Sequence, residues 1–202
     1  MDVDDTITAV EEETTTELGR LGSDKALLAA TDAKLAPDSV WTAAATREAG
    51  VADAIESWTV DDDSSETVQA AFSTAATAAT DRLARIDAAP EPPDALSAHL
   101  ETVDGSAARV GAGLVAVPLV LDRLYLQVVS FFINEADESS ADVARELRSG
   151  ASDLSPAREA LGALDEDACE MAREAAVEAV DVAYGEYAAA LEEMGLDPKP
   201  IC

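Results

Sequence analysis

Apolar residues recur at intervals of three and four along much of this chain, which is the spacing of one face of an α-helix. The first such run predicts an amphipathic helix from about Asp4 to about Ala33, with a bend or split near Gly19 and Gly22. Later runs predict helices at about 39–58, 66–87, 94–103, 139–148 and 165–194. The last helix should turn these residues inward: Ala168, Met171, Ala175, Val182 and Leu191.

The stretch that ends at Asn134 is apolar on all sides rather than along one face. A helix of this kind is buried all round, so we expect either the central core element or a helix that packs one face against a second subunit. Pro118 removes a backbone donor and predicts a kink. Aromatic residues make up only 4% of the chain, and alanine is abundant. The pattern therefore predicts an all-α bundle of about four long helices with extra short ones.

Proline and glycine punctuate these segments. The clearest break is Ala88–Pro93, which contains three prolines. Because a bundle also needs loops, we expect a single helical domain over residues 1–202 with this loop inside it. Gly195 and Pro198 predict the end of the last helix.

The charge is strongly unbalanced. The chain has 42 acidic and 13 basic residues, a formal net charge of −29. Such a charge repels itself unless salt screens it, and near molar salt the Debye length is about 3 Å. This composition is typical of a protein from a salt-accumulating microbe. Nucleic-acid binding needs a basic surface, so we expect no direct contact with DNA or RNA.

Other features argue for the cytoplasm. The first residues are acidic where a secretory signal is basic. The apolar stretch includes Asp122, Arg123 and Gln127, so we do not expect it to span a membrane. Two cysteines, Cys169 and Cys202, are too few for a disulfide framework or a cysteine-only zinc site.

Asp122, Arg123 and Gln127 also form a possible buried polar site within the apolar helix. A charge in a bundle needs a partner, so these residues indicate a pocket, a switch, an ion pair with another helix or local exposure at one edge. Adjacent helical residues point about 100° apart, which favours the ion pair.

An acidic helical bundle prompts the question of a di-iron site. That site uses Glu-x-x-His motifs, since residues three apart share a helix face. The chain has one histidine, His99, and Leu96 stands three residues before it. One chain therefore cannot assemble a site of the usual type.

Three segments nevertheless resemble rubrerythrin-family, ferritin-like proteins of halophilic archaea. They are Glu17–Leu27 (ELGRLGSDKAL), Trp41–Trp58 and Glu192–Cys202 (EEMGLDPKPIC). The resemblance implies a ferritin-like up-down bundle, in which metal-binding members reduce peroxide or oxidise iron.

The ligand set implied by the resemblance is incomplete. Glu17 and Glu48 match carboxylate positions, but Val51 stands where a histidine should follow Glu48. The expected Glu-x-x-His of the third helix is Ala79-Thr80-Asp81-Arg82, so an arginine replaces the histidine. The resemblance thus implies a degenerate relative with no catalytic residues and no cofactor.

Three hypotheses for function follow. The leading one is a non-catalytic ferritin-like protein that acts through protein contacts, as a homodimer or with another protein. The second is an iron- or peroxide-handling oxidoreductase with an iron or manganese site built from Glu17, Glu48 and Glu178. The third is a regulator or chaperone-like peptide binder, which a large apolar cleft beside Pro118 would favour.

Overall fold

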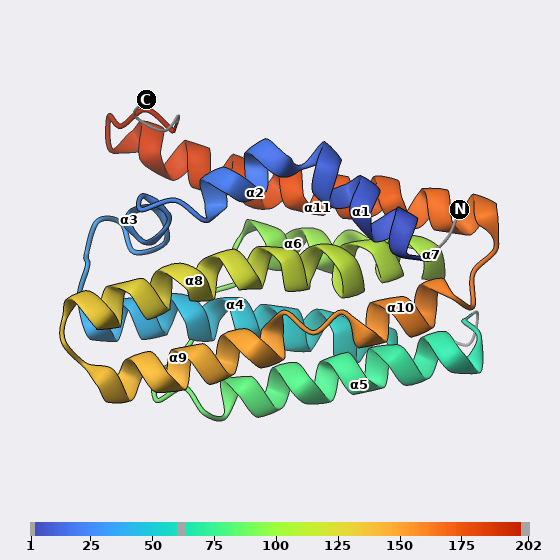
Figure 1. Ribbon diagram of the computed structural model, residues 1–202, viewed down its shortest axis with the longest axis horizontal. Coiled ribbons are helices and arrows are strands. Elements are labelled where there is room, and N and C mark those ends of the chain that lie inside the picture. The colour runs from blue at the N-terminus through green and yellow to red at the C-terminus, as the bar shows by residue number, and fades with distance from the viewer. Residues whose placement is uncertain (1–2, 60–63, 199–202) are drawn as a thin grey trace.

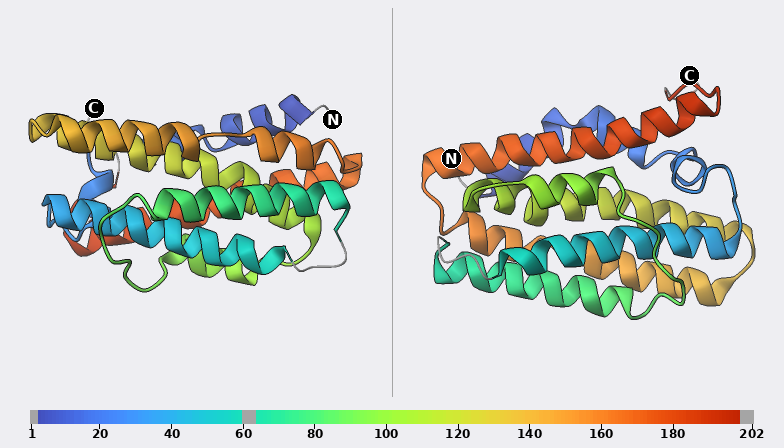
Figure 2. Two further views of the ribbon diagram at one scale, coloured as in Figure 1. Left: turned by 90° about the horizontal axis from the view of Figure 1, so that it is seen from below. Right: turned by 180° about the vertical axis from the view of Figure 1, so that it is seen from behind.

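The computed structural model describes residues 3–59 and 64–198. Within these ranges the chain forms helices, turns and loops but no β-strand, which confirms the all-α prediction. Figures 1 and 2 show an elongated bundle whose longer helices run along one common axis. The N- and C-terminal ends of the described chain lie toward opposite ends of this axis (Figure 1).

The structure divides the predicted N-terminal helix into α1 (Val3–Glu13), α2 (Thr15–Leu21) and α3 (Ala26–Ala30). The split predicted near Gly19 and Gly22 is confirmed at Gly22, whereas the break at Thr14 was not predicted. Thr14, between α1 and α2, is buried and its hydroxyl donates to the Val10 carbonyl. Gly22 follows α2, and a Cβ at this position would lie 3.1 Å from Arg123 Cδ. The break at Thr14 coincides with a local hydrogen bond, whereas Gly22 packs closely against a distant part of the chain.

The longer helices reverse direction from one to the next along the chain (Figure 1). Helix α4 packs on α5, α8 packs on α9, and α6 lies against both α4 and α11. Helices α1 and α2 contact α11. The Ala88–Pro93 loop connects α5 to α6. The bounds are α4 (Pro37–Trp58), α5 (Glu66–Leu83), α6 (Ala95–Thr102), α7 (Ser106–Arg109), α8 (Val117–Asn134), α9 (Glu138–Ala151), α10 (Ser155–Leu161) and α11 (Glu166–Glu193).

A π-helical segment, η1 (Val110–Ala116), joins α7 to α8 in the middle of the bundle. Every residue from 110 to 121 is buried by this same chain, as predicted for a central core element. The predicted all-round burial is wrong for 122–134, where most residues are partly or fully exposed. The sequence predicts a kink at Pro118, and the structure has this π-helical segment directly before the helix that contains Pro118. A π-helix bonds residues five apart, which suits a position where Pro118 offers no donor. At Gly111 a Cβ would overlap the Ala172 carbonyl of α11, so only glycine permits this approach.

Together α7, η1 and α8 form one continuous helix, Ser106–Asn134. By length and composition alone it could cross a membrane, since its most apolar window has a mean hydropathy of 1.6. In the structure more than half of its most apolar window is buried inside the bundle.

Alanine forms much of the face that α11 turns to the core. The buried positions include Ala172, Ala176, Ala179 and Ala183. The predicted inward position of Met171 is wrong, since this side chain is 52% exposed; Ala168, Ala175 and Val182 are partly exposed, and Leu191 is buried as predicted. Alanines occur on every side of this helix, so its apolar pattern does not reveal which side faces inward.

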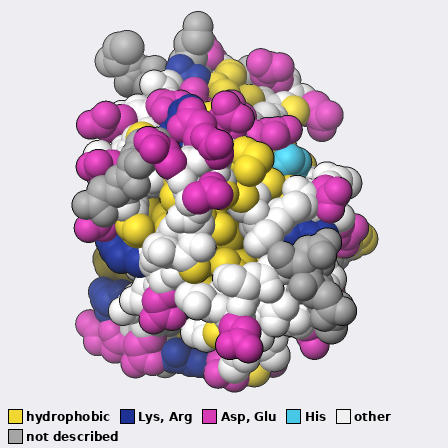
Figure 3. Space-filling view, turned by 90° about the vertical axis from the view of Figure 1, so that its right-hand side faces the viewer, with side chains coloured by type: hydrophobic (Ala, Val, Ile, Leu, Met, Phe, Trp, Pro, Cys, Tyr) yellow, Lys and Arg dark blue, Asp and Glu magenta, His cyan; other side chains and the backbone are white. Residues whose placement is uncertain are grey.

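Acidic side chains cover much of the outer surface. Figure 3 views the end of the bundle near the N-terminus and shows many Asp and Glu side chains around a smaller apolar area. The few bases seen there lie among acids. This arrangement fits the strong negative charge of the sequence, because solvent and ions can reach these carboxylates.

Candidate functional site

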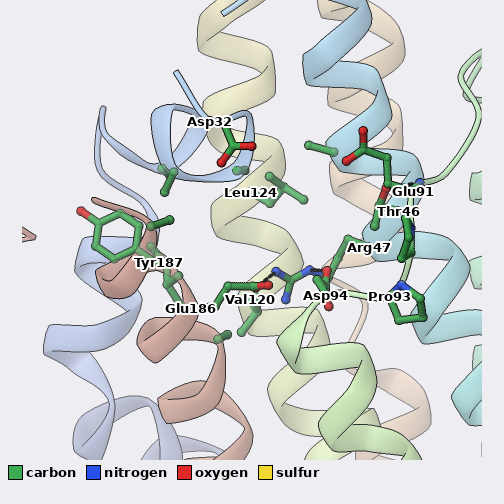
Figure 4. A pocket seen from close by; sticks show the side chains of 18 residues that line it. Asp32, Thr46, Arg47, Glu91, Pro93, Asp94, Val120, Leu124, Glu186 and Tyr187 are labelled. Atoms are coloured by element: carbon green, nitrogen blue, oxygen red, sulfur yellow. Dashed lines mark hydrogen bonds and ion pairs between the residues drawn. The ribbon is translucent and has the colours of Figure 1, made fainter. Parts of the chain in front are cut away.

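A cleft of about 370 Å³ opens between α3, α4 and α11, and the segment before α6 forms part of its wall (Figure 4). Its apolar lining comes from small residues of α3 and α11 and from Val120 and Leu124 of α8. Alanines at 26, 29, 30, 43, 183 and 190 leave this space open, because their side chains end at Cβ. The size lies at the lower end of the range of small-molecule sites.

One wall of the cleft is a network of charges centred on Arg47 of α4, whose Nη1 is buried and has no hydrogen-bond partner among the described residues. The Arg47 Nε lies 2.5 Å from Asp94 Oδ2, and Nη2 donates to Glu186 Oε2 at 3.0 Å. The other carboxylate oxygens accept backbone N–H groups: Asp94 Oδ1 from Ser97 at 2.8 Å, and Glu186 Oε1 from Ala95 at 2.8 Å. The network therefore joins the first turn of α6 to α4 and α11.

The proline-rich loop is held over the cleft by a backbone contact. Thr46 Oγ1 of α4 accepts the N–H of Glu91 at 2.8 Å. The Glu91 side chain is exposed at the mouth, and Asp32 is exposed on the wall formed by the end of α3 (Figure 4). In the ranges that the structure describes, neither carboxylate has an ion-pair or hydrogen-bond partner. The cleft thus has an apolar floor, a fixed polar wall and two unpaired carboxylates at its mouth.

A second polar cluster lies inside the bundle around Glu48 of α4, whose side chain has no exposed surface. Arg82 of α5 binds both of its oxygens, from Nε at 2.8 Å and from Nη2 at 2.9 Å. The Tyr125 hydroxyl of α8 donates to Glu48 Oε1 at 2.9 Å. Burial, followed by the negative charge of Glu48, raises the pKa of Tyr125 well above its ordinary value. This tyrosine therefore stays a donor, and the cluster links three helices.

The structure does not unite the three carboxylates proposed as metal ligands. Glu48 is enclosed with Arg82, whereas Glu17 of α2 and Glu178 of α11 lie close to Asp181. Burial, and then the charges of Glu17 and Glu178, raise the pKa of Asp181. Across residues 3–59 and 64–198, no group of three or more His, Cys, Asp or Glu side chains could hold a metal ion.

Asp122, Arg123 and Gln127 lie at a partly exposed edge of α8 rather than in an enclosed site. Asp122 accepts from Arg148 of α9 at 2.8 and 3.3 Å, which makes an ion pair between helices. Arg123 lies 3.6 Å from Asp122, and Gln127 Nε2 donates to the Gly22 carbonyl at 2.6 Å. These contacts attach α9 and the end of α2 to α8.

Two further expectations concern Pro118 and the cysteines. The hollow beside Pro118 is only about 70 Å³, so the larger cleft lies elsewhere. The Cys169 side chain is buried, and burial raises the pKa of its thiol, as suits a small core residue. Cys202 lies outside the described residues.

Sequence reasoning missed the Arg47 network. One signal was available: Arg47 is the only base in α4, in a chain with 13 bases against 42 acids. Arg47, Arg82 and Arg148 each bind an acid on another helix. At these three positions a scarce base forms an interhelical ion pair, although its partner is not visible in the sequence.

Comparison with known proteins adds no relative. No protein-family model, curated protein or solved structure matches this chain. The site is accordingly interpreted from its own geometry.

Proposed function

We propose that this chain is a non-catalytic helical protein that acts by binding, and that the cleft between α3, α4 and α11 is its binding site. The observation that carries the proposal is the combination of an open apolar floor with a polar wall that is already fixed. Ligand sites are commonly preformed, largely apolar and bordered by a few placed polar groups.

Binding fits this geometry better than catalysis. A general base needs a free, reachable oxygen or nitrogen, held beside the group on which it acts. The free carboxylates of the cleft, Asp32 and Glu91, are exposed at its mouth, and its described lining has no His or Cys beside them. The Glu186 and Asp94 oxygens at the wall are occupied by Arg47 and by backbone N–H groups. In the core, both Glu48 oxygens are bound by Arg82. These charges are used to position helices, which supports a role as a scaffold for a bound group.

A cleft-filling variant tests the proposal. Ala43→Phe should fill the cleft, since Ala43 lines it, whereas Ala70→Phe on the exposed face of α5 is the matched control. Ligand-observed NMR with a panel of neutral, cationic and anionic fragments should detect binding to the wild type and to the Ala70 variant. Loss of binding in the Ala43 variant alone supports the proposal. Equal binding in all three proteins, or in none, would overturn it.

A second candidate is function through protein contacts, as a homodimer or with another protein. Leu35, Ile133 and Leu196 are large apolar residues with 40% or more of their surface exposed. They belong to the α3–α4 connection, the last turn of α8 and the segment after α11, which share one end of the bundle (Figure 1). An exposed apolar area of this kind favours association.

Analytical ultracentrifugation in molar potassium chloride tests this candidate. We expect a dimer that Ile133→Asp dissociates. Met171→Asp is the control, because Met171 is also about half exposed but lies on the first half of α11. A monomeric wild type, or equal effects of both substitutions, would reject homodimerisation through this end.

The ferritin-like relationship, and a place in the cytoplasm of a salt-accumulating microbe, also belong to this proposal. Their support is the acid-rich composition and the position of Arg82 against Glu48, where the resemblance would place a histidine. The alternative of an iron- or peroxide-handling enzyme predicts stoichiometric iron or manganese. Metal analysis of protein purified without chelator should find neither, and one bound metal per chain would restore the alternative.

A further inference from the structure

The mouth of the cleft carries two carboxylates on opposite walls. Figure 4 shows Asp32 on the α3 side and Glu91 on the α4 side, with Leu124 on the floor between them. The two segments that bear these acids are far apart in sequence and meet only in the fold. Neither carboxylate has a hydrogen-bond or ion-pair partner among the described residues, so both can receive a group that enters the cleft.

A few exposed acids of this chain are neutralised locally. Asp4, Asp142 and Glu146 each lie beside an arginine. Among the described residues that line the cleft, the one base, Arg47, is shared by Asp94 and Glu186. Four acids and one base line the cleft. Its interior therefore attracts positive charge and opposes the entry of an anion.

The floor limits the kind of cation. Val120, Leu124 and Tyr187 present apolar surface beneath the two carboxylates. A hydrated metal ion would gain nothing from this surface, whereas a carbon chain would bury area against it. The shape and the charge together fit a molecule with an apolar body and an ammonium group.

We propose that the cleft binds a small organic cation, with its ammonium group between Asp32 and Glu91 and its apolar body against Val120 and Leu124. This inference rests on the proposed binding function and specifies the chemical class of its ligand. The partner is a small molecule because the cleft volume of about 370 Å³ accommodates a chain of several carbon atoms.

The test compares three probes of equal length: hexylammonium, 1-hexanol and hexanoate. Their affinities are measured by calorimetry at fixed salt for the wild type, for Asp32→Asn with Glu91→Gln, and for Asp53→Asn with Glu159→Gln. Asp53 and Glu159 are exposed acids outside the cleft lining, so both double variants carry the same net charge. Asn suits position 32, where φ is +48°, because Asn tolerates the left-handed region.

We expect hexylammonium to bind the wild type and the Asp53/Glu159 variant equally. It should bind the Asp32/Glu91 variant about tenfold more weakly, as two exposed ion pairs of up to about 1 kcal/mol each allow. Hexanoate should bind worst. If 1-hexanol binds the wild type as tightly as hexylammonium, or both double variants bind hexylammonium equally, the cation inference fails while binding at the cleft survives. If no probe binds, both proposals fail.

Discussion

Substitution of Arg82 by methionine would leave the Glu48 carboxylate buried without a cation. Arg82 supplies two hydrogen bonds, at 2.8 and 2.9 Å, to a side chain with no exposed surface. Methionine retains much of the apolar stem but neither hydrogen bond nor charge. Only the Tyr125 hydroxyl would still donate to Glu48.

The magnitude follows from this enclosure. Removing one partner of a buried ion pair costs about 3–5 kcal/mol, because the other charge stays desolvated. Replacing the whole cluster with apolar residues should cost far less, since a buried pair adds little net stability of its own. The triple variant Glu48→Met, Arg82→Met, Tyr125→Phe is therefore expected to lie within about 2 kcal/mol of the wild type.

Urea unfolding at a fixed molar salt concentration, followed by circular dichroism, measures these differences. Arg145→Met is the matched control, because Arg145 is 51% exposed and pairs with Asp142 one turn away. Arg145→Met should lower the free energy of unfolding by less than about 1 kcal/mol. If Arg82→Met costs no more than Arg145→Met, or if the triple variant is as unstable as the single one, the argument from an unpaired buried charge is refuted.

Four further substitutions probe packing and charge. Gly111→Ala should lower the free energy of unfolding by about 3 kcal/mol, because its Cβ would overlap a backbone carbonyl. Gly185→Ala, with open space around it, should raise this free energy by about 1 kcal/mol in the same urea assay. Equal effects of the two substitutions would contradict the packing. Ala136→Gly should raise the free energy of unfolding by about 1 kcal/mol, since φ is +57° at this position. An unchanged urea midpoint would contradict this expectation. Asp181→Asn should stabilise at pH 7: the folded-state pKa of Asp181 is raised, so its charged form opposes folding. This gain should vanish below about pH 4 in urea titrations, and a gain independent of pH would contradict the sign.

Helix positions were the most predictable part of the fold. The predicted segments at 39–58 and 165–194 lie close to α4 and α11, because capping residues and prolines act locally. The N-terminal prediction placed a split near Gly22, where α2 ends, but missed the break at Thr14, whose hydroxyl donates to the Val10 carbonyl. A spacing pattern cannot report such an interruption.

The candidate sites were less predictable than the helices. Sequence reasoning singled out Glu48 and noted that Arg82 occupies the place of a histidine, and the structure joins these two residues directly. As possible metal ligands, however, sequence reasoning grouped Glu48 with Glu17 and Glu178, which lie near Asp181. The cleft had no sequence signal, because alanines that leave a space open look the same as alanines that fill a core.

The sequence by itself determined that this chain is helical, that its surface is strongly acidic and that one apolar helix occupies the centre. These properties depend on local propensity, periodicity and composition, which act over a few residues. Only the tertiary structure decided which face of α11 is buried and which acid binds each arginine. These outcomes depend on the register between helices that are distant in sequence, and one turn of shift would change every partner. For the same reason, Asp32 and Glu91 become a candidate site only once α3 and the proline-rich loop meet at the cleft.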